Sequence, residues 1–277
     1  MTIIGTPKIF DLSKALIKNG DTVTVSSGAT SKDNILDFDK FTRWESVGSD
    51  DLTTETITVT FSEPRTFDRI LLTRHNFKSY SIAPATGSFT NVIGLFSQTP
   101  GLGISETDYG IGDSYYEFDS ISTTGIVSTV TLAQTVDAQK YIFNLIPTSE
   151  LGTFQTYPVI ASNDFQALVS KTMNRRAVVN KLNPVFSASL SIELGNNQND
   201  VDLMTLLADR NDDFILWANG GQLTENESAS PFYRFSFKPY RLGDFYKCQV
   251  VSSKLPEFIN NIYVNAFIAN LQLIETA

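Results

Sequence analysis

Alternating apolar and polar residues recur along most of the chain and predict β-strands rather than helices. Residues 55–61 place Ile57, Val59 and Phe61 on one face and threonines on the other. This period-two pattern is typical of a sheet with one buried face. A proline turn is expected at 62–65. Further strand patterns occupy the following ranges: 21–29, 66–77, 128–134 and 140–147.

The C-terminal part repeats the strand pattern around a single helical segment. Residues 177–194 are expected to form paired strands, and 199–210 form the one convincing helix, with Asn199 as its cap and a wide apolar stripe. Strands are then expected at 213–219, 232–237, 245–253 and 264–275. In the third of these, alternation makes Cys248 a small core residue. The fold class predicted is therefore all-β with one short helix.

Composition supports a folded β protein and narrows its partners. Of the 277 residues, 42% are hydrophobic, and the 20 Phe and 10 Tyr favour strands. A net charge of −9, with no basic cluster larger than Arg175-Arg176, argues against tight nucleic-acid binding. The N-terminal residues lack the pattern of a signal peptide, and no stretch reaches the roughly 18 apolar residues of a membrane span. The protein is therefore expected to be made in a cytoplasm, without membrane insertion.

Two domains are expected, at 1–160 and 165–277. Residues 83–114 are rich in Gly, Ser, Thr and Pro and are too long for an ordinary connection, which indicates an elaborated loop or insertion in the first domain. Enzyme signatures are missing from the sequence. His75 is the single histidine, which excludes multi-histidine zinc motifs, and no nucleophile elbow or phosphate-binding loop occurs. We therefore predict no catalytic residues and no enzyme activity.

The stretch NILDFDKFTRWES, residues 34–46, is the most informative local motif. Asp37 and Asp39 are expected to bond nearby backbone amides and fix a turn, while Trp44 fills a core edge. The two carboxylates could instead supply ligands to Ca²⁺, although the spacing fails the EF-hand pattern. A catalytic acid pair is the weakest of the three readings, since two carboxylates alone make no active site.

This motif, with residues 20–33 before it and 55–82 after it, resembles the discoidin family, also called F5/8 type C. The resemblance implies a galactose-binding-like jelly roll, in which this loop ties the sandwich and some members hold Ca²⁺ beside it. Asp37 and Asp39 are then the candidate calcium positions, and calcium is the only cofactor considered. Phe38 stands where the family has a glycine.

The order of elements from 185 to 275 resembles the tail-tube fold of phages, which also occurs in distal-tail and baseplate hub proteins. This resemblance implies a β-sandwich or split barrel that forms rings by strand addition between subunits. Because the strand at 264–275 ends the sequence, we expect its edge to pair with a neighbouring copy. Phe267 and Leu271 are the candidate interface residues, and 232–237 is expected in the same shared sheet.

We therefore expect a non-enzymatic structural protein of a phage virion, part of the tail or baseplate, which forms a homo-oligomeric ring and contacts neighbouring tail proteins. The alternative is a carbohydrate-binding adhesin module, in which Trp44, Phe77 and Tyr80 stack on a glycan or else belong to the core. A third reading is an accessory module of a glycoside-active enzyme.

Overall fold

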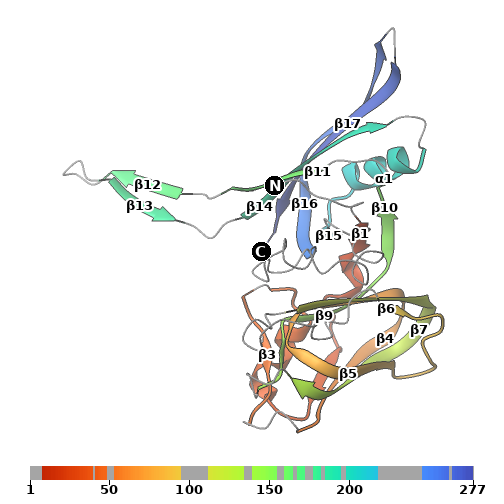
Figure 1. The fold of residues 1–277 in the computed structure, drawn as a ribbon, viewed down its shortest axis with the longest axis vertical. Helices are drawn as coiled ribbons and strands as arrows, with labels where there is room; N and C mark the ends of the chain where they lie inside the picture. The colour runs from red at the N-terminus through yellow and green to blue at the C-terminus, as the bar shows by residue number, and fades with distance from the viewer. Residues whose placement is uncertain are drawn as a thin grey trace, which may run out of the picture. The chain divides into compact units, whose positions relative to one another are not determined.

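The computed structural model describes the following residues: 8–39, 41–48, 53–94, 112–133, 139–154, 159–164, 167–171, 177–181, 185–194, 198–217, 245–261 and 264–276. These fall into two compact units (Figure 1). The N-terminal unit comprises the described part of 10–150 together with Phe245. The C-terminal unit comprises residues 8–9 and the described parts of 151–217 and 246–276. The start of the first strand, residues 8–9, thus belongs to the later unit, and this differs from the boundaries expected from the sequence.

The N-terminal unit is built on two very long antiparallel strands, β4 (Glu55–His75) and β7 (Gly112–Ala133). They form the centre of a sheet with the order β2-β4-β7-β5, to which β6 and β9 add beside β7 and β4. Short β3 pairs with β8. The remaining bounds are β2 Thr22–Val25, β3 Trp44–Glu45, β5 Phe77–Pro84, β6 Ile93–Gly94, β8 Tyr141–Ile142 and β9 Asn144–Thr148, with 3-10 helices at Leu12–Lys14 and Ala29–Ile35.

Strand β7 folds over so that its two halves face each other. Tyr80 in β5 pairs with Val130 near the end of β7, yet its hydroxyl donates a hydrogen bond to Ser114 near the start, at 2.7 Å. Sixteen extended residues would span about 50 Å, far beyond the reach of a tyrosine. The strand must therefore bend, and the sheet closes into two layers around one core.

The bend in β4 lies at residues 62–65, where the sequence predicted a proline turn. The prediction of a turn was wrong, because the strand bends there and continues. The chain does not reverse at 62–65, because Thr60 pairs with Gly125 and Arg65 with Thr123 on the same partner strand. The residues between are extra on the β4 side, as in an extended β-bulge, which bends a strand without ending it. Proline is tolerated there because the ladder is already interrupted.

The predicted alternation in 55–61 is confirmed. Ile57, Val59 and Phe61 are buried, whereas the intervening threonines are partly or fully exposed. Both halves of the bent strands contribute to this core. Its buried members are Val23, Ile35, Leu36, Trp44, Ile57, Val59, Phe61, Phe67, Ile70, Leu72, Phe77, Phe118, Ile126, Val130, Ile142 and Leu145.

The C-terminal unit is a seven-stranded sheet with the order β10-β1-β15-β16-β17-β14-β11, and one helix, α1 (Gln198–Ala208), packs on its core. The strands are β1 Lys8–Asp11, β10 Glu150–Thr153, β11 Val159–Asp164, β14 Val185–Leu194, β15 Phe214–Trp217, β16 Phe245–Asn261 and β17 Val264–Glu275. A separate antiparallel pair is made by β12 (Ala167–Lys171) and β13 (Ala177–Lys181). The strands expected over 177–194 are therefore not each other's partners.

The predicted helix and core cysteine are confirmed. Leu203, Met204 and Leu207 of α1 lie in one cluster with Cys248, although Leu206 is 45% exposed, so the apolar stripe is narrower than expected. Asn199 lies inside the first turn rather than at the cap position. The predicted all-β fold class is likewise confirmed, with α1 as the one α-helix of the described residues beside two 3-10 helices. In the part of the chain that the structure describes, no helix is long and apolar enough to cross a membrane.

The expected subunit edge at β17 is wrong. This strand pairs with β16 on one side and β14 on the other, so its backbone has no open edge along the paired residues. Leu271 is 1% exposed and belongs to the core, and the backbone of Phe267 lies between Leu194 and Phe258. A chain's last strand need not be a sheet's last strand, because sheet order is independent of chain order. The strand expected at 232–237 falls outside the described residues.

Candidate functional site

The loop predicted to tie the sandwich is held by its own acidic side chains. Asp37 accepts hydrogen bonds from the backbone N–H of Asp39 at 2.8 Å and from the hydroxyl of Thr42 at 3.0 Å, and Asp39 accepts one from the N–H of Phe41 at 2.8 Å. Phe38 between them has φ +55°, so it keeps a left-handed conformation that favours glycine. The loop is a hydrogen-bonded corner.

Asn144 of β9 connects this corner to the sheet. Its amide donates to the carbonyl oxygen of Asn34 at 3.2 Å and to Asp37 Oδ1 at 3.3 Å, while Asn34 donates to the carbonyl oxygen of Arg43 at 3.1 Å. Burial raises the pKa of the Asp37 carboxyl, and the hydrogen bonds it accepts only partly oppose that effect. The hydrogen bonds that Asp37 and Asp39 accept therefore support the structural role predicted for them.

The calcium role has less support. Within the described ranges, no group of three or more His, Cys, Asp or Glu side chains gathers where a metal ion could bind. Both carboxylate oxygens of Asp37 already accept hydrogen bonds from protein donors. A calcium ion needs six to eight oxygens, so Asp37 and Asp39 would supply only a minority of its ligands.

Trp44 lies in the core. Its side chain is fully buried, and Nε1 donates to the carbonyl oxygen of Ser27 at 3.0 Å. The sequence left two roles open for the predicted aromatics, stacking on a ligand or packing in the core. Trp44 packs in the core. Phe77 is also buried, at 4% exposure, and packs in the same core cluster. Tyr80 is half-buried.

Tyr80 belongs to a chain of polar side chains between the layers. Tyr116 donates to Tyr80 at 2.6 Å, Tyr80 donates to Ser114, and Ser114 lies 2.8 Å from His75 Nε2. The backbone N–H of Phe77 donates to His75 Nδ1 at 3.1 Å, so in the neutral ring the proton sits on Nε2. Burial lowers the pKa of His75 to about 3. This histidine is a buried, neutral packing group.

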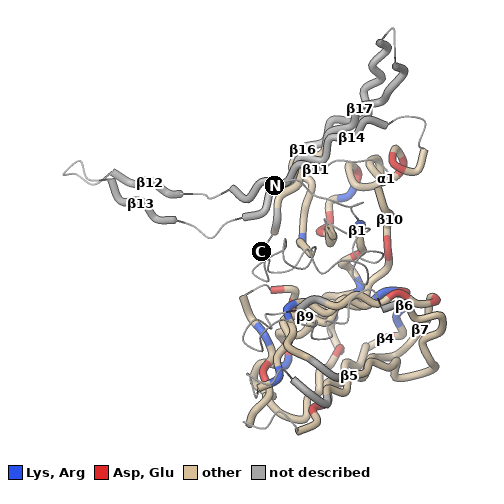
Figure 2. Tube along the Cα trace, in the orientation of Figure 1, with Lys and Arg blue, Asp and Glu red and all other residues tan. Residues whose placement is uncertain are grey.

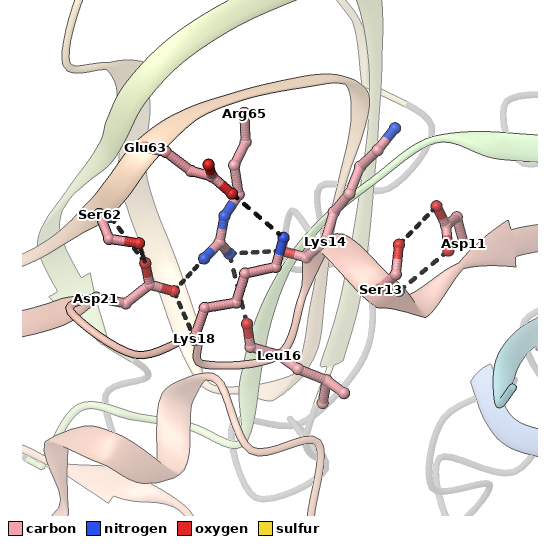
Figure 3. Close-up of polar contacts among 9 residues, drawn as sticks. All are labelled: Asp11, Ser13, Lys14, Leu16, Lys18, Asp21, Ser62, Glu63 and Arg65. Carbon is pink, nitrogen blue, oxygen red and sulfur yellow. Dashed lines mark hydrogen bonds and ion pairs between the residues drawn. The ribbon is translucent and has the colours of Figure 1, made fainter.

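Two ion-pair centres in this unit are structural. The guanidinium of Arg65, 4% exposed, pairs with Asp21 and donates to the carbonyl oxygen of Lys14 at 2.9 Å, which ties the segment before β2 to the bulge of β4 (Figure 3). The hydrogen bonds to Asp21 lower its pKa, although burial alone would raise it. Removing one partner of such a buried pair is strongly destabilising, because it leaves an uncompensated buried charge.

The second centre surrounds Arg69. Its guanidinium lies 3.3 Å from both Glu117 and Glu150 and 3.5 Å from Asp68. Burial alone would lower the pKa of Arg69, but its interactions with Tyr115 and these carboxylates outweigh burial and raise the pKa. Tyr115 is fully buried beside them and donates to Glu117 at 3.2 Å, and burial raises the pKa of its hydroxyl. The three carboxylates act as counter-charges to Arg69, and the pairs join β4 to β7 and to Glu150 at the start of β10.

A third cluster lies where β3, β8 and the end of β4 meet, and we call it the arginine–aromatic cluster: Arg43, Glu45, Arg74, Tyr141 and Phe143. The guanidinium carbon of Arg43 lies 4.2 Å from the centre of the Tyr141 ring and 5.9 Å from that of Phe143. Arg74 approaches the same Phe143 ring at 5.4 Å. Arg43 also pairs with Glu45.

Backbone pairing fixes this arrangement. Trp44 pairs with Ile142 across β3 and β8, which sets Arg43 beside Phe143, and the N–H of Phe143 donates to the carbonyl oxygen of Thr73 at 3.2 Å. Asn76, 1% exposed, holds the same segment by donating to the carbonyl oxygen of Gln139 at 2.7 Å and accepting from the N–H of Tyr141 at 2.8 Å. The cluster therefore rests on a rigid support.

The cluster reaches the surface. Arg43 and Glu45 side chains are 37% and 38% exposed, and Phe143 is half-buried. In the adjoining loop, Phe41 is 62% and Val47 is 72% exposed. Figure 2 shows Lys and Arg segments gathered on the side of the N-terminal unit that carries β3, with acidic segments among them. This surface combines aromatic faces, paired charges and exposed apolar side chains.

Sequence reasoning missed this cluster. Arg43 lies inside the motif of residues 34–46, but its partners in the cluster lie about thirty and one hundred residues further along the chain. Only the β3–β8 ladder and the irregularity in β4 near Arg74 bring them together. The one available signal was the Thr-Arg-Trp run, which places an arginine beside a core tryptophan in a short strand.

Solved structures similar to this chain include several carbohydrate-binding modules. Chitosan-binding module 1 of a chitosanase/glucanase from Paenibacillus sp. IK-5 is 23% identical over 50% of this chain and 97% of its own, with a TM-score of 0.34. A module of a family 31 glycoside hydrolase from Clostridium perfringens is 19% identical over 50% and 92%, with a TM-score of 0.35. Another from Clostridium perfringens, in complex with GalNAc-β-1,3-galactose, is 11% identical over 47% and 94%, at 0.34.

The other comparisons return nothing. No family model matches the chain, and no curated protein matches it. The structural likeness covers about half of the chain. At these identities and TM-scores it assigns neither a family nor a ligand. The comparisons give no support to the resemblance of the C-terminal part to tail-tube proteins, and that resemblance stays a prediction.

Proposed function

We propose that the N-terminal unit is a non-catalytic carbohydrate-binding module whose site is the arginine–aromatic cluster. The observation that carries the proposal is the half-buried Phe143 ring approached by two guanidinium groups, with their carbons 5.4 and 5.9 Å from its centre. This makes the carbohydrate-binding reading, given above as the alternative, the main one. The ligand aromatics differ from those predicted, because Trp44 and Phe77 are core residues.

The chemistry of sugars matches this surface. A pyranose ring has a face of C–H groups that packs on an aromatic ring, and the negative π-face of the ring favours such contact. Its hydroxyls need donors and acceptors in fixed directions. The fork of Arg43, fixed by Glu45 and by the Tyr141 ring, supplies donors, and Glu45 supplies acceptors. A few convergent polar groups around an aromatic wall are typical of small-molecule sites.

Binding to a panel of immobilised oligosaccharides, using the full chain, tests the proposal. Phe143→Leu should abolish binding because it removes the aromatic face while retaining apolar volume. Phe89→Leu is the matched control, since Phe89 is also a partly buried phenylalanine of this unit but packs on Phe118, with ring centres 4.3 Å apart. Loss of binding in both variants, or in neither, would contradict the proposed site, and no binding by the parent to any saccharide would contradict the function.

A second candidate function uses the C-terminal unit. The outer strands of its sheet, β10 and β11, each pair with only one other strand among those described, so each has an edge with no partner in the described part of the chain. Such an edge is a template for strand addition. This observation favours a self-associating structural protein, as the predicted ring of a phage tail or baseplate would be, although the edge differs from the predicted β17. Native mass spectrometry of the full chain should then show oligomers, and a monomer at all concentrations would exclude this candidate.

A further inference from the structure

The ladder between β3 and β8 continues beyond the arginine–aromatic cluster. Trp44 pairs with Ile142, and two residues further along the chain the N–H of Ser46 donates to the carbonyl oxygen of Lys140 at 2.8 Å. The N–H of Lys140 in turn donates to the hydroxyl of Ser46 at 2.8 Å. The segment that begins at Arg43 therefore stays paired past the end of β3.

Side chains of this segment alternate between an inner and an outer face. Trp44 and Ser46 are 0% and 5% exposed, so they point into the unit. Successive side chains of an extended segment point to opposite faces, which places Arg43, Glu45 and Val47 together on the outer face. Val47 is 72% exposed. The outer face of the cluster is therefore continued at one end by an exposed apolar side chain.

The other end of this outer face also carries an exposed apolar side chain. Phe41 lies two residues before Arg43, and it is 62% exposed. Its backbone N–H donates to Asp39 at 2.8 Å, and the hydroxyl of the next residue, Thr42, donates to Asp37 at 3.0 Å. The backbone that carries the Phe41 ring is thus held by the hydrogen-bonded corner, so the ring has an ordered support beside the cluster.

The row from Phe41 to Val47 is longer than one sugar. These residues are six positions apart, and an extended chain rises about 3.3 Å per residue, so the row spans up to roughly 20 Å. A single pyranose ring covers only part of that length, whereas several linked units would cover it. Exposed apolar side chains that gather around polar groups mark interaction surfaces, whereas singly scattered ones do not. The row therefore suits an elongated ligand.

We propose that the arginine–aromatic cluster is the centre of an elongated site that binds several consecutive units of a glycan chain, with outer subsites at Phe41 and Val47. Phe143 packs on a central sugar ring, and Arg43 and Glu45 bind its hydroxyls. The Phe41 ring stacks on the C–H face of a unit towards one end of the chain, and Val47 contacts a unit towards the other end. This inference rests on the proposed function and specifies its ligand as a chain rather than a terminal sugar.

Calorimetric titration of the full chain with oligosaccharides of increasing length tests this site. The probes are β-1,4-linked oligomers of glucose, of N-acetylglucosamine and of galactose, each with one to six units. In a series that binds, the affinity should rise at least about tenfold between one and four units and then level off, because further units reach past the outer subsites. Phe41→Ser and Val47→Thr should each lower the affinity for the longer oligomers several-fold and leave that for the single sugar unchanged.

Val92→Thr is the matched control, because Val92 is another exposed valine of this unit, at 50%, and lies just before β6. It should leave every affinity unchanged. Equal affinity for all lengths, lost in Phe143→Leu, would keep the proposed function and overturn the elongated site. Length dependence that survives both Phe41→Ser and Val47→Thr, or a loss that is equal for one and six units, would also overturn it. No binding in any series would overturn this inference, and the oligosaccharide panel then decides the proposed function separately.

Discussion

The indole N–H of Trp44 donates to the carbonyl oxygen of Ser27 at 3.0 Å, and this bond joins the loop motif to the turn after β2. Trp44→Ala should therefore cost roughly 3–5 kcal/mol of unfolding free energy, since it empties a fully buried site. Trp44→Phe keeps much of the volume and loses the bond, so we expect a smaller loss. Urea melts of both variants measure the difference, and a Trp44→Ala midpoint equal to the parent's would show that the loop is no structural tie.

Gly28, next to Ser27, should not tolerate a side chain. A Cβ at this position would lie 1.9 Å from the carbonyl oxygen of Glu45 and 2.9 Å from Trp44 Nε1, and its φ is +66°. We expect Gly28→Ala to destabilise the N-terminal unit by more than about 2 kcal/mol. Gly48→Ala is the control, because Gly48 also has positive φ but open space around its Cβ. Equal melting temperatures for the two variants would contradict the close contact.

Stability should fall as the pH is lowered from about 6.5 towards 3 because of His75. Its pKa is about 3 in the folded chain and near 6.5 when unfolded, so in this window the unfolded state binds the extra proton. The contribution is fully present above the unfolded value and is lost as the pH falls. His75→Gln removes this titration and should flatten the slope of unfolding free energy against pH. An unchanged slope between pH 4 and 7 would show that His75 is not held neutral.

Breaking the buried pair of Arg65 and Asp21 should be costly. Asp21→Asn leaves the guanidinium of Arg65 buried without its counter-charge, for which we expect a loss of roughly 3–5 kcal/mol. Replacing both, with Arg65→Met and Asp21→Asn, should cost less than the sum of the single changes. Denaturant melts of the three variants give the coupling energy, and simple additivity would mean that the pair does not act as a unit.

The order of apolar and polar residues correctly predicted those elements that depend on neighbouring residues alone. The alternation in 55–61, the helix with Leu203 and Leu207, and the core position of Cys248 follow from residue type and period alone. The bends of β4 and β7 could not be foreseen, since a bulge depends on the partner strand as much as on its own residues. The same holds for the site. Arg43 and Phe143 meet only because a two-residue ladder pairs Trp44 with Ile142.

The interface prediction failed for a related reason. Leu271 alternates with polar neighbours, which fits either a subunit contact or the interior of a sheet. The sequence shows which face is apolar but does not show what covers it. In the fold, β14 and β16 flank β17 and the apolar face meets α1 and β1. Leu271→Lys should accordingly act as a core change, because Leu271 is 1% exposed and packs in the core of this unit.

An NMR titration tests the central claim most directly. An oligosaccharide that the full chain binds is added stepwise, and the chemical shifts of the backbone amides are measured. We predict that the largest changes fall on residues 41–47, 73–76 and 139–144, which carry or support the arginine–aromatic cluster, and that Phe143→Leu removes them while Phe89→Leu does not. Shifts confined to other residues, or a titration that leaves these three segments unchanged, would contradict the assignment of the cluster as a carbohydrate site.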